Sequence, residues 1–295
     1  MHEVRAKGIL SAQNGMNLYR GCTHGCIYCD SRSTCYRMSH DFEDVEVKVN
    51  APELLERALR AKRRRCMIAT GAMSDPYQPA ERALKLTRRC LEIVERHGFG
   101  IALLTKSDLV LRDLDLLKRI HAKAKCVVQM TLTTCDPALC RIVEPNVCDT
   151  GRRAEVLQIL RDAGIPTVVW LTPVLPFLND TPENVRGLMD LCVRAGARGV
   201  VTFGEMGLTL RDGDRQHYYR KLDEHFPGLR ARYERTFGAD YLLPSPQSAE
   251  LMEIVRTACE RQGMLFGADE VFAYLRRFED PFGGTQIGMF DGPPG

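Results

Sequence analysis

No part of this 295-residue sequence is apolar for long enough to cross a membrane. A membrane-spanning helix needs about 18 or more consecutive apolar residues, and the apolar runs here are much shorter. The N-terminal segment, residues 1–7, also lacks the apolar core of a signal peptide. We therefore expect a cytoplasmic protein with no membrane association.

The sequence has little net charge. Its formal charge is +3 at pH 7 and its pI is near 8.2, whereas dedicated nucleic-acid-binding domains are usually more basic. One short segment, residues 60–65, concentrates arginine and lysine. Such a segment is typical of a solvated helix end, and contact with phosphate is the alternative. Charge alone therefore supports a nucleic-acid partner only weakly.

The sequence also lacks the setting in which its 12 cysteines would form a disulfide scaffold. Disulfide-dense proteins are small and secreted, and we expect this chain to be neither. Five cysteines lie singly in apolar stretches, where a buried thiol behaves as a small apolar side chain: Cys66, Cys90, Cys126, Cys192 and Cys259. A dinucleotide-binding enzyme is disfavoured as well, because no G-x-G-x-x-G follows the first expected strand.

What the sequence does have is a regular alternation of short apolar runs and longer segments with helical periodicity. Strands are expected at residues 16–20, 66–70, 101–104, 126–132, 165–171 and 200–203. Helices are expected between them, at residues 51–65, 79–97, 111–124, 150–163 and from 182 onward. Such alternation implies parallel strands with right-handed crossovers. An open doubly wound sheet and a full or partial (βα) barrel remain as alternatives.

The composition changes after residue 210. Residues 211–240 are rich in charged and aromatic residues, a helix is expected at 246–262, and the Gly- and Pro-rich segment from residue 281 is expected to be irregular. We therefore predict two parts, residues 1–210 with the alternating strands and helices, and residues 211–295 as a helical C-terminal extension.

The most informative segment is residues 21–29, with the sequence GCTHGCIYC. Cys22, Cys26 and Cys29 have the spacing C-x3-C-x2-C, which allows one short loop to supply thiolates to separate irons of a [4Fe–4S] cluster. Gly21 and Gly25 permit the unusual backbone angles of such a loop. Three ligands leave the fourth iron open, and an open position on a metal is where a substrate or cofactor binds.

A zinc site is the alternative interpretation of this loop, with His24 or Cys35 as the fourth ligand. Zinc sites usually combine two C-x2-C elements, and the sequence has no second pair of this kind. We therefore favour the iron–sulfur cluster.

The C-x3-C-x2-aromatic-C motif, with Tyr28 before the last cysteine, resembles that of the radical S-adenosylmethionine (SAM) superfamily. The resemblance implies a partial (βα)6 barrel of the TIM type. It implies that the open iron binds SAM, and that an electron from the cluster cleaves SAM to a 5′-deoxyadenosyl radical that abstracts hydrogen from a substrate. It also implies an electron donor of the flavodoxin or ferredoxin type.

Further motifs resemble the spore photoproduct lyase-like family within that superfamily, over roughly residues 10–205. They are SDPYQPAE at 74–81, TKS at 105–107, LTT at 132–134, EP at 144–145 and AGIP at 163–166. The family's lyase uses a cysteine just before the Ser-Asp pair as a hydrogen donor, whereas residues 71–73 here are Gly, Ala and Met. This departure argues against photoproduct repair, unless Cys135, Cys140 or Cys148 serves instead.

Polar residues that follow the expected strands are the candidate SAM contacts, because such residues in barrels tend to serve the active site. By the resemblance, Ser74 holds one end of the methionyl group, Lys106 binds its carboxylate, and Tyr28 packs against adenine. The neighbouring Asp75 is a candidate partner for the methionyl ammonium.

Two threonines of the fourth strand, Thr131 and Thr133, share one face. They are candidates for the ribose of SAM if Gln129 points inward, and ordinary strand residues otherwise. Arg141 and Glu144 are expected to bind each other or the substrate.

The function predicted from the sequence is hydrogen abstraction by a radical SAM enzyme of lyase-like type. A nucleic-acid lesion or modified nucleotide is the favoured substrate, since Tyr218, Tyr219 and Tyr233 could stack on unpaired bases. A peptide or a small metabolite is the alternative substrate. A non-catalytic iron–sulfur or metal-binding module is the alternative of another class.

Overall fold

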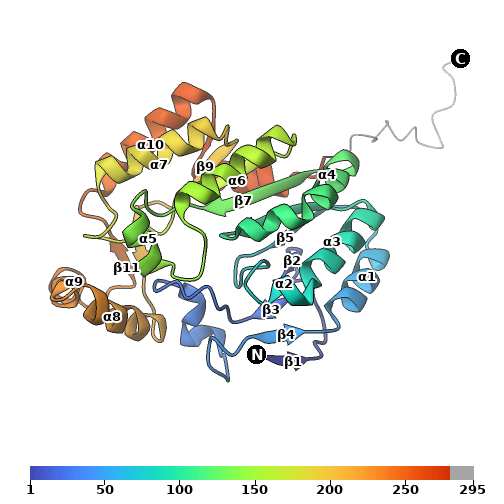
Figure 1. The fold of residues 1–295 in the computed structure, drawn as a ribbon, viewed down its shortest axis with the longest axis horizontal. Helices are drawn as coiled ribbons and strands as arrows, with labels where there is room; N and C mark the ends of the chain where they lie inside the picture. Colours follow the sequence, from blue (N-terminus) through green and yellow to red (C-terminus); the bar gives the residue numbers. More distant parts are fainter. Residues whose placement is uncertain (280–295) are drawn as a thin grey trace, which may run out of the picture.

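A parallel sheet of seven strands forms the centre of the protein in a computed structural model that describes residues 1–279 (Figure 1). The strands lie in the order β12-β9-β8-β7-β6-β5-β2. Their bounds are β2 Gly15–Met16, β5 Met67–Thr70, β6 Gly100–Thr105, β7 Cys126–Thr131, β8 Thr167–Trp170, β9 Gly199–Val201 and β12 Leu265–Phe266. Strand order follows chain order without reversal, whereas a doubly wound sheet reverses at a switch point. The partial-barrel alternative is therefore confirmed.

One face of the sheet is covered by helices that connect successive strands (Figure 1). They are α1 Ala51–Ala61, α3 Leu86–His97, α4 Leu114–Lys123, α6 Thr150–Asp162 and α7 Pro182–Arg194, joined by α10 Ser248–Gln262. Alternate strand residues, such as Ile101, Val128 and Val169, pack into the same apolar core as these helices. Among the helices of residues 1–279, none is long and apolar enough to cross a membrane.

Most expected bounds differ from the observed ones by a few residues, and at three places an expected element is divided or changes type. The first expected strand is divided into β2 and β3 (Tyr19–Arg20), and β3 belongs to a second sheet of order β1-β4-β3, with β1 His2–Val4 and β4 Glu46–Lys48. The expected helix at 79–97 is broken at Lys85, whose φ of 48° separates α2 (Glu81–Leu84) from α3. The helix expected from residue 111 begins as a 3₁₀ turn, Asp108–Asp113, and becomes α4 at Leu114.

The other face of the sheet is partly covered by the last described helix, α11 (Gly267–Arg276). Val271 and Leu275 of this helix pack with Ala102, Val127 and Val168 of the central strands. The buried Lys125 ammonium donates to the carbonyls of Tyr274 at 2.6 Å and Arg277 at 3.3 Å, and so holds the end of the helix in place.

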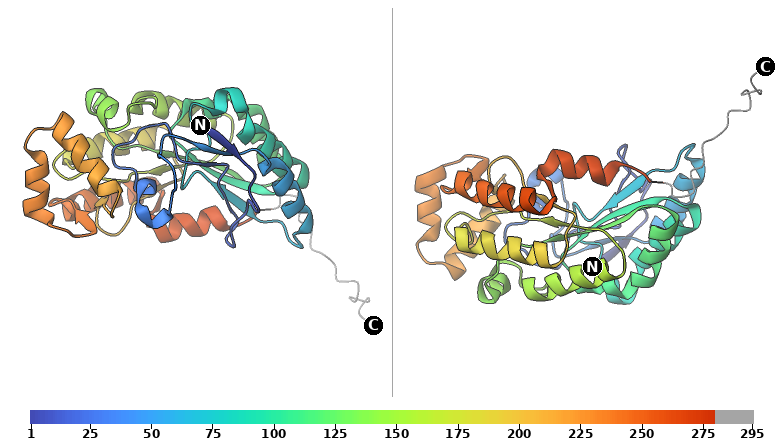
Figure 2. Two further views of the ribbon diagram at one scale, coloured as in Figure 1. Left: turned by 90° about the horizontal axis from the view of Figure 1, so that it is seen from below. Right: turned by 90° about the horizontal axis from the view of Figure 1, so that it is seen from above.

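The segment after residue 206 forms a two-stranded antiparallel sheet and a helical pair at one end of the molecule (Figure 2). Strands β10 (Gly207–Thr209) and β11 (Leu242–Pro244) are antiparallel, and α8 (Asp214–His225) contacts α9 (Leu229–Phe237). Beyond them, β12 and α11 rejoin the main sheet. The boundary at residue 210 stays a prediction, and the segment from residue 281 lies outside the described residues.

Candidate active site

The three cysteines of the C-x3-C-x2-C motif follow β3 on a loop above the carboxyl ends of the sheet strands. Cys22 and Cys26 are buried and Cys29 is half-buried. The loop passes so close to its neighbour that a Cβ at Gly21, where φ is 86°, would lie 2.3 Å from the Phe42 carbonyl oxygen. The Cys22 amide donates to that same oxygen at 3.2 Å. Glycine at this position is therefore required by both the backbone angle and the space.

The chemistry of the three thiols fits an iron–sulfur cluster. Burial raises the pKa of Cys26, and the negative charges of Glu144, Cys29 and Cys22 raise it further although Lys106 opposes them. Three thiolates on one short loop need a counter-charge, and cluster iron supplies it. Within residues 1–279, the cysteine loop holds no three ligand atoms within 4.8 Å of one another. A single tetrahedral ion needs closer ligands, so the geometry does not favour zinc.

The two residues considered as a fourth zinc ligand have other contacts. Cys35 is exposed and its sulfur lies 3.3 Å from an Arg211 guanidinium nitrogen. His24 is buried, and its Nδ1 lies 3.4 Å from an Asp75 carboxylate oxygen. Although burial lowers the pKa of His24, the charge of Asp75 raises it to about 10. His24 and Asp75 therefore form a buried ion pair.

Asp75 joins the cysteine loop to the ends of β5 and β6. One carboxylate oxygen accepts from the Tyr77 amide at 2.8 Å and from the Thr105 hydroxyl at 2.7 Å. The other accepts from the Lys106 amide at 2.8 Å and faces His24. Both oxygens thus have protein partners, so the geometry indicates a positioning role, and direct contact of Asp75 with SAM stays a prediction.

A second buried carboxylate holds the other end of the loop. The Tyr28 hydroxyl donates to Glu144, and Glu144 forms an ion pair with the fully buried Arg153. Burial raises the pKa of Glu144, but the positive charges of Arg153 and Lys106 outweigh it and leave the pKa below its usual value. Arg153 also donates to the Thr131 carbonyl at 2.7 Å. Tyr28 is therefore fixed to the end of β7.

The remaining candidate residues lie around this arrangement. The Lys106 ammonium lies 5.8 Å from the centre of the Tyr28 ring, and the Ser74 hydroxyl donates to the Tyr19 carbonyl at 3.0 Å. The Thr133 hydroxyl is buried and makes no hydrogen bond to the described protein. A buried polar group without a partner is costly unless a ligand supplies one. These residues fit a cofactor with a carboxylate, an ammonium and ribose hydroxyls, as SAM has.

Next to these residues lies a cavity of about 620 Å³ on the face of the sheet that α11 partly covers. Gln129 lines it, one alternation before Thr131 on β7, so Thr131 faces the same side of the sheet. Its walls are formed mainly by apolar and small side chains, among them Met16, Ala69, Ala72, Ala102, Leu104, Trp170 and Phe272. A cavity of this volume can hold a small molecule or a single base.

Sequence reasoning missed several residues that shape the site. Gln78 is fully buried, and its side-chain oxygen accepts from the Thr23 amide at 3.2 Å. Arg153 was missed because it lies in a helix among other charged residues. The expected pairing of Glu144 with Arg141 is wrong, since Arg141 is exposed and Arg153 is the partner. The contact between Glu144 and Tyr28 of the loop joins residues far apart in the sequence, so residue spacing does not show it.

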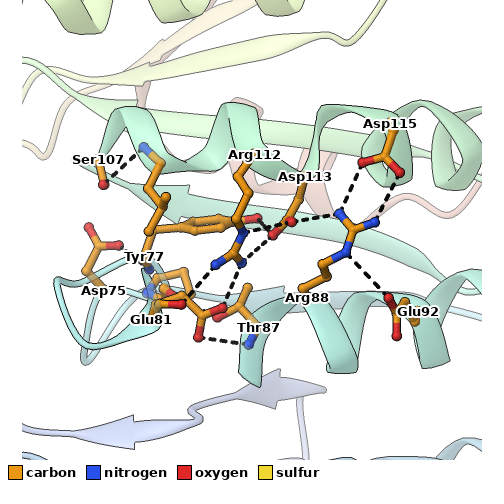
Figure 3. Close-up of polar contacts among 12 residues, drawn as sticks. Asp75, Tyr77, Glu81, Thr87, Arg88, Glu92, Ser107, Arg112, Asp113 and Asp115 are labelled. Atoms are coloured by element: carbon orange, nitrogen blue, oxygen red, sulfur yellow. Dashed lines mark hydrogen bonds and ion pairs between the residues drawn. The ribbon is translucent and has the colours of Figure 1, made fainter. Parts of the chain in front are cut away.

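A second network of buried charges lies beside the site (Figure 3). Glu81 accepts hydrogen bonds from the Tyr19 hydroxyl, the Thr87 amide and Arg112, and Arg112 also pairs with Asp113. This network joins the α2–α3 segment to the start of α4. Through Tyr19 it also binds β3, the strand that precedes the cysteine loop. Tyr77 links this network to the predicted cofactor residue Asp75 (Figure 3), because its hydroxyl donates to Asp113 at 3.0 Å and its amide donates to Asp75 at 2.8 Å.

A family model described as the radical SAM superfamily matches residues 16–192 of the chain. The protein belongs to the radical SAM superfamily. The matched range contains the cysteine loop and the candidate residues at the ends of β5, β6 and β7. As a member of this family the protein uses a [4Fe–4S] cluster and SAM, is an enzyme, and needs a reductant.

Relatives in other organisms cover most of this radical SAM chain. An uncharacterized protein of Mycobacterium tuberculosis (strain H37Rv) is 33% identical over 269 residues, which is 86% of this chain and 78% of the relative. An uncharacterized protein of Methanocaldococcus jannaschii is 33% identical over 174 residues, 58% of this chain and 64% of the relative.

Solved structures of radical SAM enzymes have the same fold. Spore photoproduct lyase complexed with a dinucleoside spore photoproduct superposes with a TM-score of 0.63 at 14% identity, over 88% of this chain and 78% of that one. TsrM of Kitasatospora setae is a methyltransferase solved with cobalamin and a [4Fe–4S] cluster. It superposes with a TM-score of 0.57 at 14% identity, over 89% of this chain and 55% of that one. At these identities the likeness shows the fold alone, and it confirms the predicted partial barrel.

Proposed function

We propose that this radical SAM enzyme acts on a base of a nucleic acid, a lesion or a modified nucleotide, held in the cavity beside Gln129. With an electron from the reduced cluster, bound SAM supplies a 5′-deoxyadenosyl radical that takes a hydrogen atom from the substrate. The electron donor in this proposal is of the flavodoxin or ferredoxin type. The other parts of the proposal concern what the protein's own residues do.

An aromatic group at the cavity carries the proposal. Trp170 and Phe272 line the cavity, and the ring of Phe203 lies 5.8 Å from Trp170 and 6.1 Å from Phe272 between centres. Phe203 is 44% exposed, so part of its ring remains open to a ligand. Base stacking on such rings contributes about 1–3 kcal/mol per base. The nearby Gln129 amide can bond a base edge, since Gln129 keeps an NH2 group while its oxygen accepts from Trp170 at 2.9 Å.

The basic segment at residues 60–65 lies at the edge of the same cavity. The Lys62 ammonium donates to the side-chain oxygen of Asn14 at 2.7 Å, and Asn14 lines the cavity. Arg63 and Arg64 are exposed. Cations beside the entrance provide a place for the phosphates that flank a bound base.

The tyrosines chosen from the sequence for base stacking are not available for it. Tyr218, Tyr219 and Tyr233 are buried in one apolar cluster with Cys26 and Tyr28. Their rings support the cysteine loop from the side of α8 and α9. The stacking surface is therefore assigned to Trp170, Phe203 and Phe272 instead.

At the mouth of the barrel, we propose that Lys106 binds the SAM carboxylate and Ser74 the methionyl group. In the same proposal, the Thr131 and Thr133 hydroxyls contact the ribose and Tyr28 packs against the adenine. The raised pKa of Lys106 supports this role: burial lowers the pKa, but the charges of Cys26 and Glu144 more than offset burial and keep the ammonium protonated.

Repair of the spore photoproduct itself is not part of the proposal. At Gly71, φ is 102° and a Cβ would lie 1.9 Å from the Leu104 carbonyl oxygen, so this position cannot hold a cysteine. Of the three alternative donors, Cys140 is buried beside Glu144 and Cys135 is exposed against Asn184. Cys148 lies 3.4 Å from the Lys106 carbonyl oxygen and is the candidate that the geometry favours.

The test is SAM cleavage by the reconstituted, dithionite-reduced enzyme with and without substrate. We expect single-stranded or UV-irradiated DNA or RNA to increase 5′-deoxyadenosine formation, and deuterium from the substrate to enter it. Phe203→Ser should abolish most of this increase while leaving the basal cleavage unchanged. Tyr241→Ser, which removes an exposed ring far along the chain from the cavity residues, is the control.

Three results would contradict the proposal in different ways. If only peptides or small metabolites transfer deuterium to 5′-deoxyadenosine, the substrate is of that class and not a nucleic acid. An equal response of Phe203→Ser and the unaltered enzyme would reject the stacking surface. A loaded cluster without any 5′-deoxyadenosine would favour a non-catalytic iron–sulfur module.

A further inference from the structure

Two histidines and two carboxylates converge at the edge of the small sheet, away from the barrel cavity. His2 lies on β1, Glu46 begins β4, and His40 and Asp44 lie in the segment that leads into β4. One ligand atom from each of His2, His40 and Asp44 lies within 4.8 Å of the others. No other group of this kind occurs among residues 1–279.

We propose that His2, His40, Asp44 and Glu46 bind a divalent transition-metal ion, with Zn²⁺ as the best match. Imidazole with carboxylate is a ligand set that zinc accepts in tetrahedral geometry. Bonds of about 2.0–2.1 Å at tetrahedral angles place neighbouring ligand atoms about 3.3 Å apart. The His2 Nδ1 to Asp44 Oδ2 distance is 3.0 Å and the His40 Nε2 to Glu46 Oε2 distance is 3.6 Å. Both are close to that value.

The hydrogen bonding of His40 prepares one ring nitrogen for a ligand. Its Nδ1 lies 2.9 Å from the Asp41 carbonyl oxygen, which can only accept, so Nδ1 carries the hydrogen. Nε2 then has a lone pair, and it is buried without a hydrogen-bond partner among the described residues. Metal-binding histidines commonly donate from the other nitrogen to a carbonyl in this way.

The arrangement of charges leaves a place for a cation. The lone pair of His40 Nε2 faces the Glu46 carboxylate, and two acceptors repel unless a proton or a metal ion lies between them. The Asp44 carboxylate binds the Met1 amine through Oδ1 at 2.5 Å, which leaves Oδ2 toward His2. His2 and Glu46 are directly opposite in the parallel β1–β4 pair. Three ligand atoms within 4.8 Å of one another, with the Glu46 carboxylate 3.6 Å from His40 Nε2 as a fourth ligand, favour the metal over a proton.

Such an ion would act on the cluster loop through the backbone. Phe42 lies between His40 and Asp44, and its carbonyl accepts from the Cys22 amide at 3.2 Å. A metal that fixes residues 40–44 therefore fixes the partner of the first cluster ligand. The inference does not depend on which substrate the enzyme uses.

The test is Co²⁺ binding to the cluster-loaded enzyme, prepared anaerobically without a tag, so that the loop cysteines are already occupied. We expect about one Co²⁺ per chain in addition to the cluster iron, with visible absorption of a tetrahedral site. His40→Gln and, separately, Asp44→Asn should weaken Co²⁺ binding at least tenfold, with the iron content unchanged. His97→Gln is the matched control, because His97 pairs with the single carboxylate of Glu56 at 2.9 Å.

The added metal should also raise the thermal midpoint of the unaltered enzyme, and the rise should be absent from both variants. The proposal is overturned if the cluster-loaded enzyme binds no Co²⁺, or if His40→Gln and Asp44→Asn bind it as well as the unaltered enzyme does. Loss of binding in His97→Gln to the same extent would overturn it too. Failure of the proposed nucleic-acid activity would affect none of these readouts.

Discussion

The cysteine loop is held from two sides that are built differently. On the barrel side, Asp75 and Glu144 are buried carboxylates whose charges are paired with His24 and Arg153. On the C-terminal side, the Asp212 carbonyl accepts from the Thr34 amide at 3.0 Å, but buried polar atoms of Asp30, Arg32, Asp214 and His217 have no hydrogen-bond partner within the described residues. Both loop-binding carboxylates on the first side have charged protein partners, whereas several buried polar atoms on the second side have no hydrogen-bond partner among the described residues.

This difference indicates where the molecule needs accurate geometry. A satisfied network of buried charges holds its members in one arrangement, as required where thiolates and SAM contacts must meet a cluster. Unpaired buried polar atoms reduce stability and are tolerated where only packing is needed. The two sides should therefore respond differently to substitution.

The largest effect is expected within the loop itself. Cys26→Ala removes a proposed cluster ligand, so iron binding and SAM cleavage should both fall to background. Cys35→Ala, on the exposed C-terminal side of the same loop segment, should keep the full iron content. Iron analysis and 5′-deoxyadenosine assays on both variants measure the contrast. Loss of iron in Cys35→Ala would indicate that Cys35 is a fourth protein ligand of the metal, as in the alternative zinc site.

The next effect compares a buried carboxylate that binds a residue of the cysteine loop, Glu144 with Tyr28, with one that binds the strand before the loop, Glu81 with Tyr19. Glu144→Gln leaves the Arg153 charge buried without a counter-charge, and such losses cost about 3–5 kcal/mol. Glu81→Gln weakens the network of Figure 3, but Arg112 keeps Asp113 as a partner, so the cost should be about 1–3 kcal/mol. Denaturant unfolding measures both values.

Cluster occupancy is the second readout of this pair. We expect Glu144→Gln to lose part of its iron, because Tyr28 is no longer held by an ionised acceptor, and Glu81→Gln to keep it. Equal iron loss in the two variants would show that stability alone, and not the contact with the loop, controls cluster binding.

A smaller effect is expected on cofactor affinity. Lys106→Met removes the proposed partner of the SAM carboxylate, and a charge-assisted hydrogen bond contributes about 1.5–3 kcal/mol. The dissociation constant of SAM for the cluster-loaded enzyme should therefore rise by about 10- to 100-fold. Lys118→Met, at an exposed position of α4, is the control. An unchanged dissociation constant in Lys106→Met would remove this residue from the SAM site.

The smallest effect concerns the C-terminal side. Burial raises the pKa of Asp214 to about 6, whereas an aspartate of the unfolded chain has a pKa of about 3.9. The folded protein thus holds this proton more tightly, so stability declines as pH rises through this range. Asp214→Asn should be more stable than the unaltered enzyme by at most about 2–3 kcal/mol above pH 7, with a smaller difference at pH 5. Unfolding curves between pH 5 and 8 test this, and a difference that does not vary with pH would exclude Asp214 as its source.

Much of the architecture and the centre of the site could be predicted from the sequence. The alternating periodicity gave the strands β5 to β9 within a few residues, because each is a short apolar run between turn residues. A helix was expected from residue 182 onward, and α7 begins there, with the Thr181 hydroxyl accepting from the Asn184 amide at 3.2 Å. The cysteine spacing predicted the cluster loop because the motif is local.

Features that depend on distant contacts were not predicted. Strands β1, β4 and β12 are too short for a periodic signal and exist because they pair with other strands. Lys85 interrupts an otherwise helical pattern. The Glu81 side chain, from the helix before the break, accepts from the Thr87 amide in the helix after it at 3.0 Å. The burial of Tyr218 and the partnership of Glu144 with Arg153 likewise follow from packing between segments far apart in sequence.

The position of β12 has a consequence for how the chain is made. This strand pairs with β9 at one margin of the sheet, and β2 occupies the opposite margin, so the first and last strands of the sheet are also its two borders. A nascent chain that has emerged only as far as α10 leaves the backbone of β9 open on one side, where strands of other chains can add. We therefore expect residues 265–276 to protect newly synthesised molecules from aggregation, so that ending the chain before Leu265 lowers the soluble yield.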